Sequence, residues 1–189
     1  MLGTMIDRGA RAAELAAHLD ALAPDERIRQ CREVGGRQQA RLWELAGDGE
    51  PLALADFVAE SLPDGRVVAF AGKNSLPALS TFEKHFVRHG GAIVGMNVQT
   101  MSFATGPGYY TCRQGEGAHG KEVLFDYTAV PSTAPAGWPA PRTNARGLSH
   151  FVYKNLHDYN RRVSRDVVIG SATRLGKPID SWYVLARKP

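Results

Sequence analysis

The sequence is poor in cysteine and has no long apolar run, and both shortages narrow what the protein can be. Only two cysteines occur in 189 residues, and neither belongs to a close cluster of Cys and His residues. We therefore expect no metal site and two reduced thiols, as is usual for a cytoplasmic protein. The strongest apolar windows, such as Val67 to Ala71, are far too short to span a bilayer. No apolar run follows a basic stretch near the first residue, so we expect neither a membrane span nor a secretory signal.

Several catalytic and cofactor-binding motifs are also missing. The chain has no Gly-x-Ser-x-Gly and no His-Glu-x-x-His sequence, which excludes two common hydrolase signatures. Gly72 to Pro77 (GKNSLP) lacks the glycine spacing of a phosphate-binding loop. The lysines and arginines are scattered and form no groove-reading motif, which argues against a nucleic-acid-binding protein. We therefore expect no cofactor and no nucleic-acid partner.

Charge is distributed unevenly along the chain. Residues 1–64 hold 7 Lys/Arg against 12 Asp/Glu, whereas residues 65–189 hold 16 against 7. The first part thus carries a net charge of −5 and the second a net charge of +9. A basic second part could attract an anionic partner. Alternatively, the acidic part docks on the basic part, or both are simply solvated.

The first 64 residues are predicted to be helical. Asp7 to Leu22 is rich in alanine and carries leucines on one side, as in an amphipathic helix. Pro24, followed by two acidic residues, suits the first turn of a second helix, which Gly35-Gly36 should interrupt. Leu52 to Leu62 is predicted to be a further short helix, closed by the turn Pro63-Asp64-Gly65.

Beyond residue 65 the pattern changes to strands joined by glycine-rich turns. The predicted strands are Arg66–Ala71, Ala92–Thr105, Tyr109–Gln114, Glu122–Thr128, Val167–Arg174 and Ser181–Lys188, the last two as a hairpin. Residues 75–89 instead carry leucine and phenylalanine at helical spacing, which predicts a helix. The proline-rich stretch Val130 to Asn144 is interpreted as an ordered crossover loop with Trp138 beneath it.

This order of elements predicts an α+β fold. Amino-terminal helices would pack on a strongly curved antiparallel sheet or a partly closed β-barrel. Residues 1–64 would form the helical segment and residues 65–189 the sheet with one or two helices, together as one folding unit. The arrangement resembles helix-plus-curved-sheet cones and small ligand-binding barrels, a likeness of architecture that transfers no function.

The segment from Leu148 to Arg165 concentrates aromatic, histidine and cationic side chains around one carboxylate, Asp158. Its periodicity fits a helix, although the letters HFVY within it favour a strand. On a helix these residues could form an ordinary solvated face with Asp158 paired to Arg162. The mixture of His, Tyr and Arg favours instead the wall of a polar pocket, because arginine binds carboxylate and phosphate groups well.

A curved sheet covered by helices encloses a cavity, and such cavities usually bind small molecules. The first hypothesis is therefore binding of a small amphipathic, anionic ligand between the sheet and the helices. The ligand-contacting residues predicted for this cavity are Arg161, Arg162, Lys154, Tyr153, Tyr159, Trp138, Phe103, Tyr127, Lys73 and Asn74. Lys73 and Asn74 are included because the start of a helix can bind an anion, although Asn74 could equally cap that helix.

The second hypothesis is an enzyme that works without a cofactor in the same cavity, by proton transfer, isomerisation or dehydration. His150 or His157 would act together with Asp126 as acid and base. On a helix, His157 cannot pair with the adjacent Asp158, so Asp126 or Tyr127 of a neighbouring strand is the better partner.

The third hypothesis is a protein-interaction module that uses the acidic helices and the basic sheet. Trp182 and Tyr183 bear on it, because two aromatic residues near the last strand could form either core or the contact of a homodimer.

Overall fold

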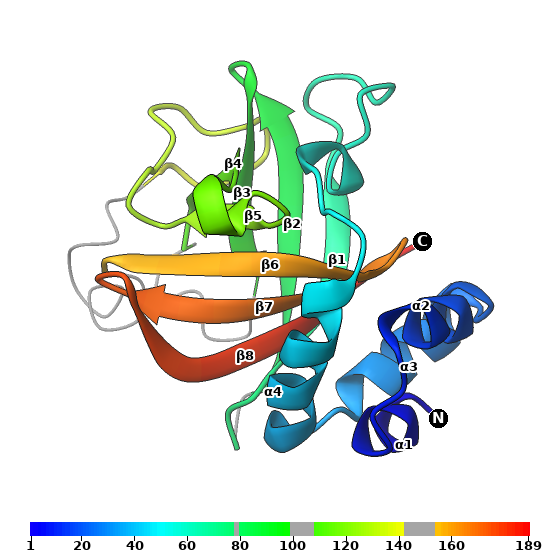
Figure 1. The fold of residues 1–189 in the computed structure, drawn as a ribbon. Helices are drawn as coiled ribbons and strands as arrows, with labels where there is room; N and C mark the ends of the chain where they lie inside the picture. Colours follow the sequence, from blue (N-terminus) through cyan, green and yellow to red (C-terminus); the bar gives the residue numbers. More distant parts are fainter. Residues whose placement is uncertain (78–79, 99–107, 142–153) are drawn as a thin grey trace.

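The structure, a computed structural model, describes residues 1–77, 80–98, 108–141 and 154–189. Within these residues, four short α-helices precede a closed antiparallel barrel of eight strands (Figure 1). The predicted α+β class, with helices beside a curved sheet or barrel, is confirmed. The sheet closes completely rather than in part.

The helices occupy the first part of the chain. They are α1 (Leu2–Asp7), α2 (Ala12–Asp20), α3 (Pro24–Arg32) and α4 (Gly36–Leu45), with the short 3-10 helices η1 (Ala46–Asp48), η2 (Leu54–Asp56) and η3 (Gly117–His119) after them. α3 begins at Pro24, where the absence of a backbone N–H on proline costs nothing, because the first N–H groups of a helix have no partner within it. Two acidic residues follow in the first turn, where the helix dipole favours anions. The helix predicted over residues 7–22 is divided, because Gly9 takes a φ of 72° just before α2.

The strands follow in order around the barrel. They are β1 (Val68–Asn74), β2 (Thr81–His89), β3 (Ala92–Val98), β4 (Tyr110–Gln114), β5 (Val123–Asp126), β6 (Leu156–Ser164), β7 (Val167–Arg174) and β8 (Lys177–Arg187). Each pairs antiparallel with the next, and β8 returns to β1, with Gly72 opposite Leu185. The hairpin predicted near the end of the chain is confirmed as β7 and β8. Because β1 pairs with β8, neither of the two edge strands of the sheet is left unpaired.

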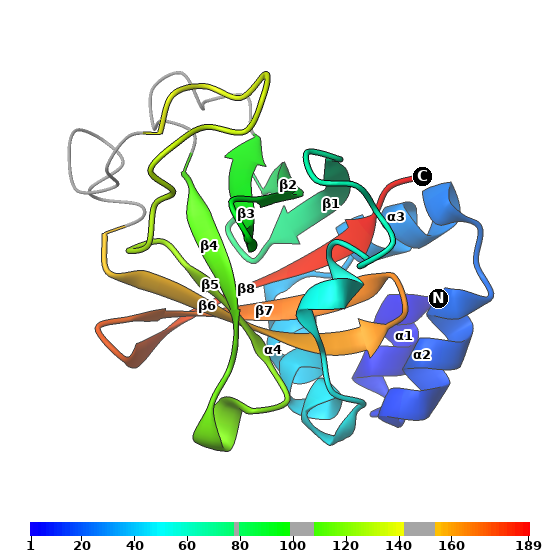
Figure 2. The same cartoon turned by 90° about the horizontal axis from the view of Figure 1, so that it is seen from above.

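The helices cover the outside of the barrel on one side, against β6, β7 and β8 (Figures 1 and 2). Leu15 of α2 and Leu42 of α4 are buried in one apolar cluster with Ile169 of β7. Each large apolar side chain withdrawn from water in this way contributes about 1.5–3 kcal/mol. We propose on this basis that the helical and barrel parts fold as one unit.

A second apolar cluster fills one end of the barrel interior. Phe57, which follows η2, enters this end, and its ring centroid lies 4.8–5.7 Å from those of Phe70, Phe86 and Phe125. The helix predicted over residues 52–62 is wrong, since only the three residues of η2 are helical there. The chain bends instead so that Phe57 can close the barrel.

The helix predicted over residues 75–89 is also wrong, because Thr81–His89 is strand β2. Phe82 and Phe86 are four residues apart, a spacing that fits one face of a helix and equally one face of a strand. In the barrel Phe82, Lys84 and Phe86 all lie on the inner face of β2. Lys84 interrupts the apolar alternation that would have indicated the strand.

The ambiguous segment Leu148 to Arg165 is described from residue 154 onward, and there it is a strand. β6 alternates between the two faces of the barrel wall, so that Asp158 faces the interior and His157 the outside. His157 and Asp158 therefore have different neighbours, although they are adjacent in the sequence.

Candidate functional site

A lysine lies in the middle of the barrel interior. The side chain of Lys84 is 1% exposed, and its Nζ donates hydrogen bonds to Asn97 Oδ1 at 2.8 Å and to Tyr127 Oη at 2.5 Å. Aromatic rings surround the ammonium group, with centroids 4.6–5.7 Å from Nζ; they belong to Phe82, Tyr110, Phe125, Tyr127 and Tyr183. Rings at this distance attract a cation through their negative faces.

Asp158 supplies the counter-charge from the opposite wall. Its Oδ2 is 3.8 Å from Lys84 Nζ, and its side chain is also buried. Two positions further along β6, Asn160 Oδ1 accepts a hydrogen bond of 2.8 Å from the hydroxyl of Tyr183. We call the six polar residues Lys84, Asn97, Tyr127, Asp158, Asn160 and Tyr183 the lysine cluster.

Burial shifts the pKa values of both charged members of the lysine cluster toward neutrality. Loss of solvent lowers the pKa of Lys84 to about 8, although the charge of Asp158 acts in the other direction. Loss of solvent likewise raises the pKa of Asp158, against the influence of Lys84 and of the Tyr183 and Tyr127 hydroxyls. The fold therefore disfavours the charged form of each group, and a buried ion pair of this kind adds little or nothing to stability. Strongly shifted groups that do not serve stability are typical of functional sites.

Glycines shape the wall around the lysine cluster. At three places on the inner face a glycine lies directly across from an aromatic residue of the next strand. The pairs are Gly72 with Phe82, Gly95 with Tyr110 and Gly170 with Tyr183. A Cβ atom on any of these glycines would lie 2.2–2.6 Å from the facing ring, closer than real contacts allow. The absent side chains let the rings lie flat across the wall and turn toward Lys84.

The variant Gly170→Ala tests this arrangement. The added methyl group would meet the ring of Tyr183 at 2.2 Å, so we expect the free energy of unfolding to fall by about 1–3 kcal/mol. In a strand without such a contact, replacing glycine by alanine is expected to raise the free energy of unfolding slightly. A decrease would therefore point to the contact with the ring of Tyr183. Urea unfolding would measure the change. An unchanged or increased free energy of unfolding in Gly170→Ala would contradict the ring contact.

On the outer wall, two predicted catalytic residues do meet. His157 Nε2 lies 3.2 Å from Asp126 Oδ1, across the β5–β6 pair. Asp126 also accepts hydrogen bonds from the hydroxyl of Thr128 at 2.5 Å and from its N–H at 2.8 Å, and it contacts the Arg113 guanidinium. Burial would raise the pKa of Asp126, but these partners outweigh it and hold the pKa below its usual value. The contact between His157 and Asp126 thus lies on the outer wall, on the opposite side of that wall from the lysine cluster.

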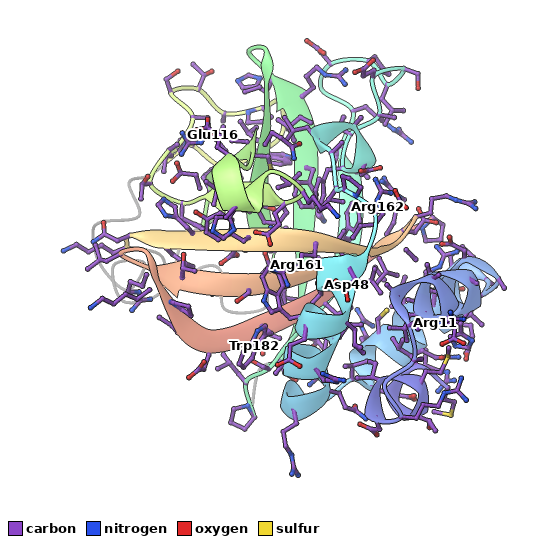
Figure 3. The ribbon with its side chains drawn as sticks, in the orientation of Figure 1. Arg11, Asp48, Glu116, Arg161, Arg162 and Trp182 are labelled. Carbon is purple, nitrogen blue, oxygen red and sulfur yellow. The ribbon has the colours of Figure 1, made fainter. Side chains whose placement is uncertain are left out.

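The two arginines predicted to hold an anion are already bound to carboxylates. Arg161 donates to Glu122 Oε1 at 2.7 Å and to the Trp43 carbonyl at 2.9 Å, and its guanidinium stacks 3.7 Å from the Trp43 ring centroid. Arg162 contacts the carboxylate of Asp56, which belongs to the acidic first part of the chain. Both arginines extend from β6 on the outside of the barrel (Figure 3).

The remaining predicted ligand residues are dispersed. Tyr159 stacks on His119 on the outer wall with ring centroids 4.0 Å apart, and Trp138 lies beside Tyr109. Lys73 Nζ donates to Ser80 Oγ at 2.5 Å. Of the eight predicted ligand residues that the structure describes, only Tyr127 belongs to the lysine cluster.

The other predicted positions do not adjoin the lysine cluster or lie outside the described residues. Asn74 Oδ1 accepts the N–H of Leu76 at 3.0 Å in a turn after β1, so no helix start stands there to bind an anion. Lys154 is exposed at the turn before β6. Three further predicted positions, Phe103, His150 and Tyr153, lie outside the residues that the structure describes.

Sequence reasoning missed most of the lysine cluster. The spacing of residues 75–89 predicts a helix around Lys84, although the alternation of Phe82, Lys84 and Phe86 at every second residue also fits one face of a strand. The sequence predicts Asp158 as the central carboxylate of a polar pocket wall or as the partner of Arg162 on a helix, and not as the partner of Lys84. Tyr183 is core, packed inside the barrel, while Trp182 packs against the helices.

The described residues offer neither a metal-binding cluster nor a membrane-spanning helix. In the described ranges no group of three or more His, Cys, Asp and Glu side chains is placed to hold a metal ion. Both cysteines are buried and reduced, and burial raises the pKa of the Cys31 thiol to about 12. None of the helices in the described part of the chain has the length and apolar character needed to cross a membrane.

Comparison of the chain with protein-family models, with curated proteins and with solved structures finds no match. The fold and the lysine cluster are therefore the basis for assigning a function.

Proposed function

We propose that the protein binds a small amphipathic ligand with an anionic head group inside its barrel, at the lysine cluster. The observation that carries the proposal is the buried Lys84 ammonium group, enclosed by aromatic rings and facing a single carboxylate. A lysine is almost never buried unless it is paired or has a functional role. Small barrels with closed sheets commonly hold one small ligand in their interior.

The chemistry of the lysine cluster suits an anion. The ammonium of Lys84 and the hydroxyls of Tyr127 and Tyr183 are donors, and the surrounding rings suit an apolar ligand body. The carboxylate of Asp158 opposes an anion only while it is charged. Because its pKa is raised, Asp158 can take up a proton as the ligand replaces it beside Lys84. Binding would then be coupled to proton uptake.

Octanoate and octanol, which share an apolar chain and differ in charge, test the proposal by titration of nitrogen-labelled protein followed by NMR. We expect octanoate to bind at least about tenfold more tightly, and to shift amide signals of β2, β3 and β6. Its affinity should fall as the pH rises through about 8, where Lys84 loses its proton. Lys84→Met/Asp158→Asn, which removes both charges, should lose the preference for octanoate.

Three results would contradict the proposal. One is equal affinity for octanoate and octanol, and another is signal changes confined to the outer wall. The third is an unchanged preference in Lys84→Met/Asp158→Asn. Lys177→Met, which removes an exposed lysine from β8, is the control for a general loss of positive charge.

A second candidate function is proton transfer catalysed without a cofactor in the same interior. The lowered pKa of Lys84 favours it, since an amine with a pKa of about 8 exists partly as free base near neutral pH. The predicted pair His157 and Asp126 lies on the outer wall, so Lys84 with Asp158 would replace it as base and acid. A rate that rises with pH through about 8 and vanishes in Lys84→Met would support this function over binding alone.

A further inference from the structure

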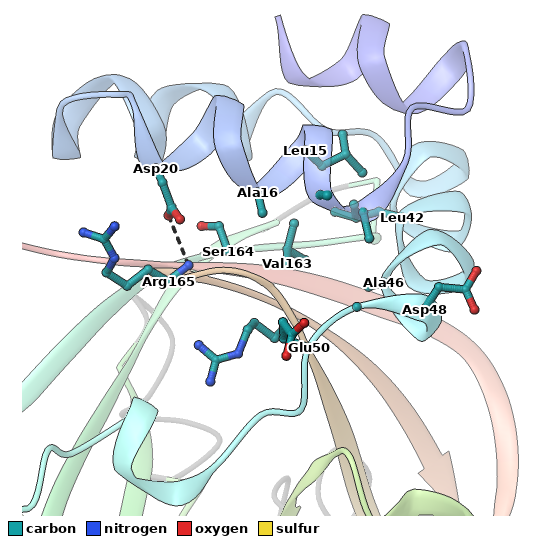
Figure 4. Close-up of a pocket in the computed structure, with 14 residues that line it drawn as sticks. Leu15, Ala16, Asp20, Leu42, Ala46, Asp48, Glu50, Val163, Ser164 and Arg165 are labelled. Carbon is teal, nitrogen blue, oxygen red and sulfur yellow. Dashed lines mark hydrogen bonds between the residues drawn. The ribbon is translucent and has the colours of Figure 1, made fainter.

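A separate pocket lies outside the barrel, between the helices and the end of β6. It has a volume of about 370 Å³ and is bordered by α2, the chain after α4, and the last residues of β6 (Figure 4). Its middle is apolar and is formed by Leu15, Ala16, Leu42 and Val163. A volume of this size accommodates a small organic molecule.

One wall of the pocket carries a buried hydroxyl group without a partner. Ser164, the last residue of β6, is 2% exposed, and its Oγ makes no hydrogen bond. Ser164 lines the pocket, where Figure 4 shows it next to Val163. A buried polar group without a partner destabilises the folded protein, so a ligand that bonds to it gains affinity. This hydroxyl is therefore a fixed point for a hydrogen-bonding group of a ligand.

The free charge of the pocket is negative. The carboxylates of Asp48 and Glu50 line it, are exposed and have no ion-pair or hydrogen-bond partner among the described residues. Arg162 is already held by Asp56, and the guanidinium of Arg165 points away from the apolar middle in Figure 4. Most of the lining residues belong to the acidic first part of the chain, which carries a net charge of −5 over residues 1–64.

The polar groups of the pocket lie around its apolar middle. In Figure 4, Ser164 lies on one side of Leu42 and Ala46 and Asp48 on the other, while Glu50 lies between them, below Val163. A ligand that reaches the carboxylates and Ser164 together needs a positive group, an apolar body and a hydrogen-bonding group at its far end.

We propose that this pocket binds a small organic cation whose ammonium group meets Asp48 and Glu50 and whose far polar group bonds to Ser164. The site is independent of the lysine cluster, and its preference for charge is the opposite one.

Tyramine is the probe, since it carries an ammonium group, an aromatic body and a terminal hydroxyl. Its matched analogues are tyrosol, which is neutral, and p-hydroxyphenylpropanoate, which is an anion. By calorimetry with the full chain we expect tyramine to bind at least about tenfold more tightly than either analogue. Asp48→Asn/Glu50→Gln, at exposed positions that the fold does not need, should remove this preference.

Two further variants locate the probe. Ala16→Leu fills the middle of the pocket and should abolish binding of tyramine, whereas Ala17→Leu, on the exposed side of the same helix, should not. Ser164→Ala should reduce the affinity for tyramine to that for phenethylamine, which lacks the hydroxyl. The Lys84→Met/Asp158→Asn variant should bind tyramine as wild type does, which separates this site from the barrel interior.

The proposal would be overturned by the absence of tyramine binding to the wild type, or by an anion that binds as tightly as tyramine. Unchanged tyramine affinity in Ala16→Leu, in Ser164→Ala or in Asp48→Asn/Glu50→Gln would also overturn it. A loss in Lys84→Met/Asp158→Asn equal to that in Ala16→Leu would place the cation in the barrel and not in this pocket.

Discussion

Replacing Lys84 by methionine is expected to lower the free energy of unfolding by about 3 kcal/mol at neutral pH. Methionine keeps the approximate shape of the lysine stem, but it leaves the buried carboxylate of Asp158 without its cation. Removing one member of a buried ion pair destabilises more than removing both, since the remaining charge keeps its desolvation penalty. The double variant Lys84→Met/Asp158→Asn should therefore recover most of the loss, because asparagine can still bond to the Tyr183 and Tyr127 hydroxyls.

Dependence on pH distinguishes this cause from a packing defect. The pKa of Asp158 is raised in the folded state, so its contribution to stability is present at low pH and lost as the pH rises through that folded value. Without Lys84 the folded pKa rises further. Urea unfolding should show the deficit of Lys84→Met shrinking as the pH is lowered, while Lys177→Met stays close to wild type. A deficit that does not change with pH would indicate that the lost contacts of the lysine stem, and not the charge of Asp158, explain the effect.

Replacing Phe57 by alanine is expected to destabilise the barrel by about 3–5 kcal/mol. Its ring is fully buried and packs against Phe70, Phe86 and Phe125 at the closed end. Truncation would leave a cavity among rings that are held by strands on different sides of the barrel, which cannot easily move inward to fill it. Thermal or urea unfolding would measure the change.

Two companion variants make the result specific. Phe57→Leu should recover a large part of the stability, because leucine fills most of the same space. Leu76→Ala removes a large side chain that is 54% exposed, and it should change stability by no more than about 0.5 kcal/mol. A loss below about 1 kcal/mol in Phe57→Ala would contradict the assignment of Phe57 as the residue that closes the barrel.

The class of the fold followed from the sequence because turn signals and apolar periodicity are local. Glycine-rich turns separate runs such as Tyr109–Gln114 from their neighbours, and Pro24 marks a helix start. Closure of the barrel is harder to predict from the sequence. It depends on the pairing of β1 with β8, which are more than a hundred residues apart, and no local pattern reports such a pairing.

The candidate site was hidden by the same local reasoning. Along β2, the charge of Lys84 at an interior position disrupted the pattern by which strands are recognised, so a helix was predicted there. Along β6, His157 and Asp158 were treated together, whereas a strand sends them to opposite sides of the wall. The contact between Asp126 and His157 could be anticipated, because only neighbouring strands can bring such residues together.

The arginines show why composition alone does not tell which cations are available to bind an anion. Arg161 and Arg162 are suited to bind carboxylates, and in the fold they do so within the chain, with Glu122 and Asp56. Such pairing depends on how the helical part lies on the barrel. The cation that we propose for an anionic ligand is instead Lys84, which lies in the barrel interior away from solvent.

Native mass spectrometry of the freshly purified full chain, beside the Lys84→Met/Asp158→Asn variant, tests the proposed binding of an anion in the barrel most directly. We expect the wild type to carry a small acid in a defined ratio, released on denaturation, and we expect the folded variant to carry none. Bare masses for both proteins, or the same molecule retained by both, would contradict a ligand site at the lysine cluster.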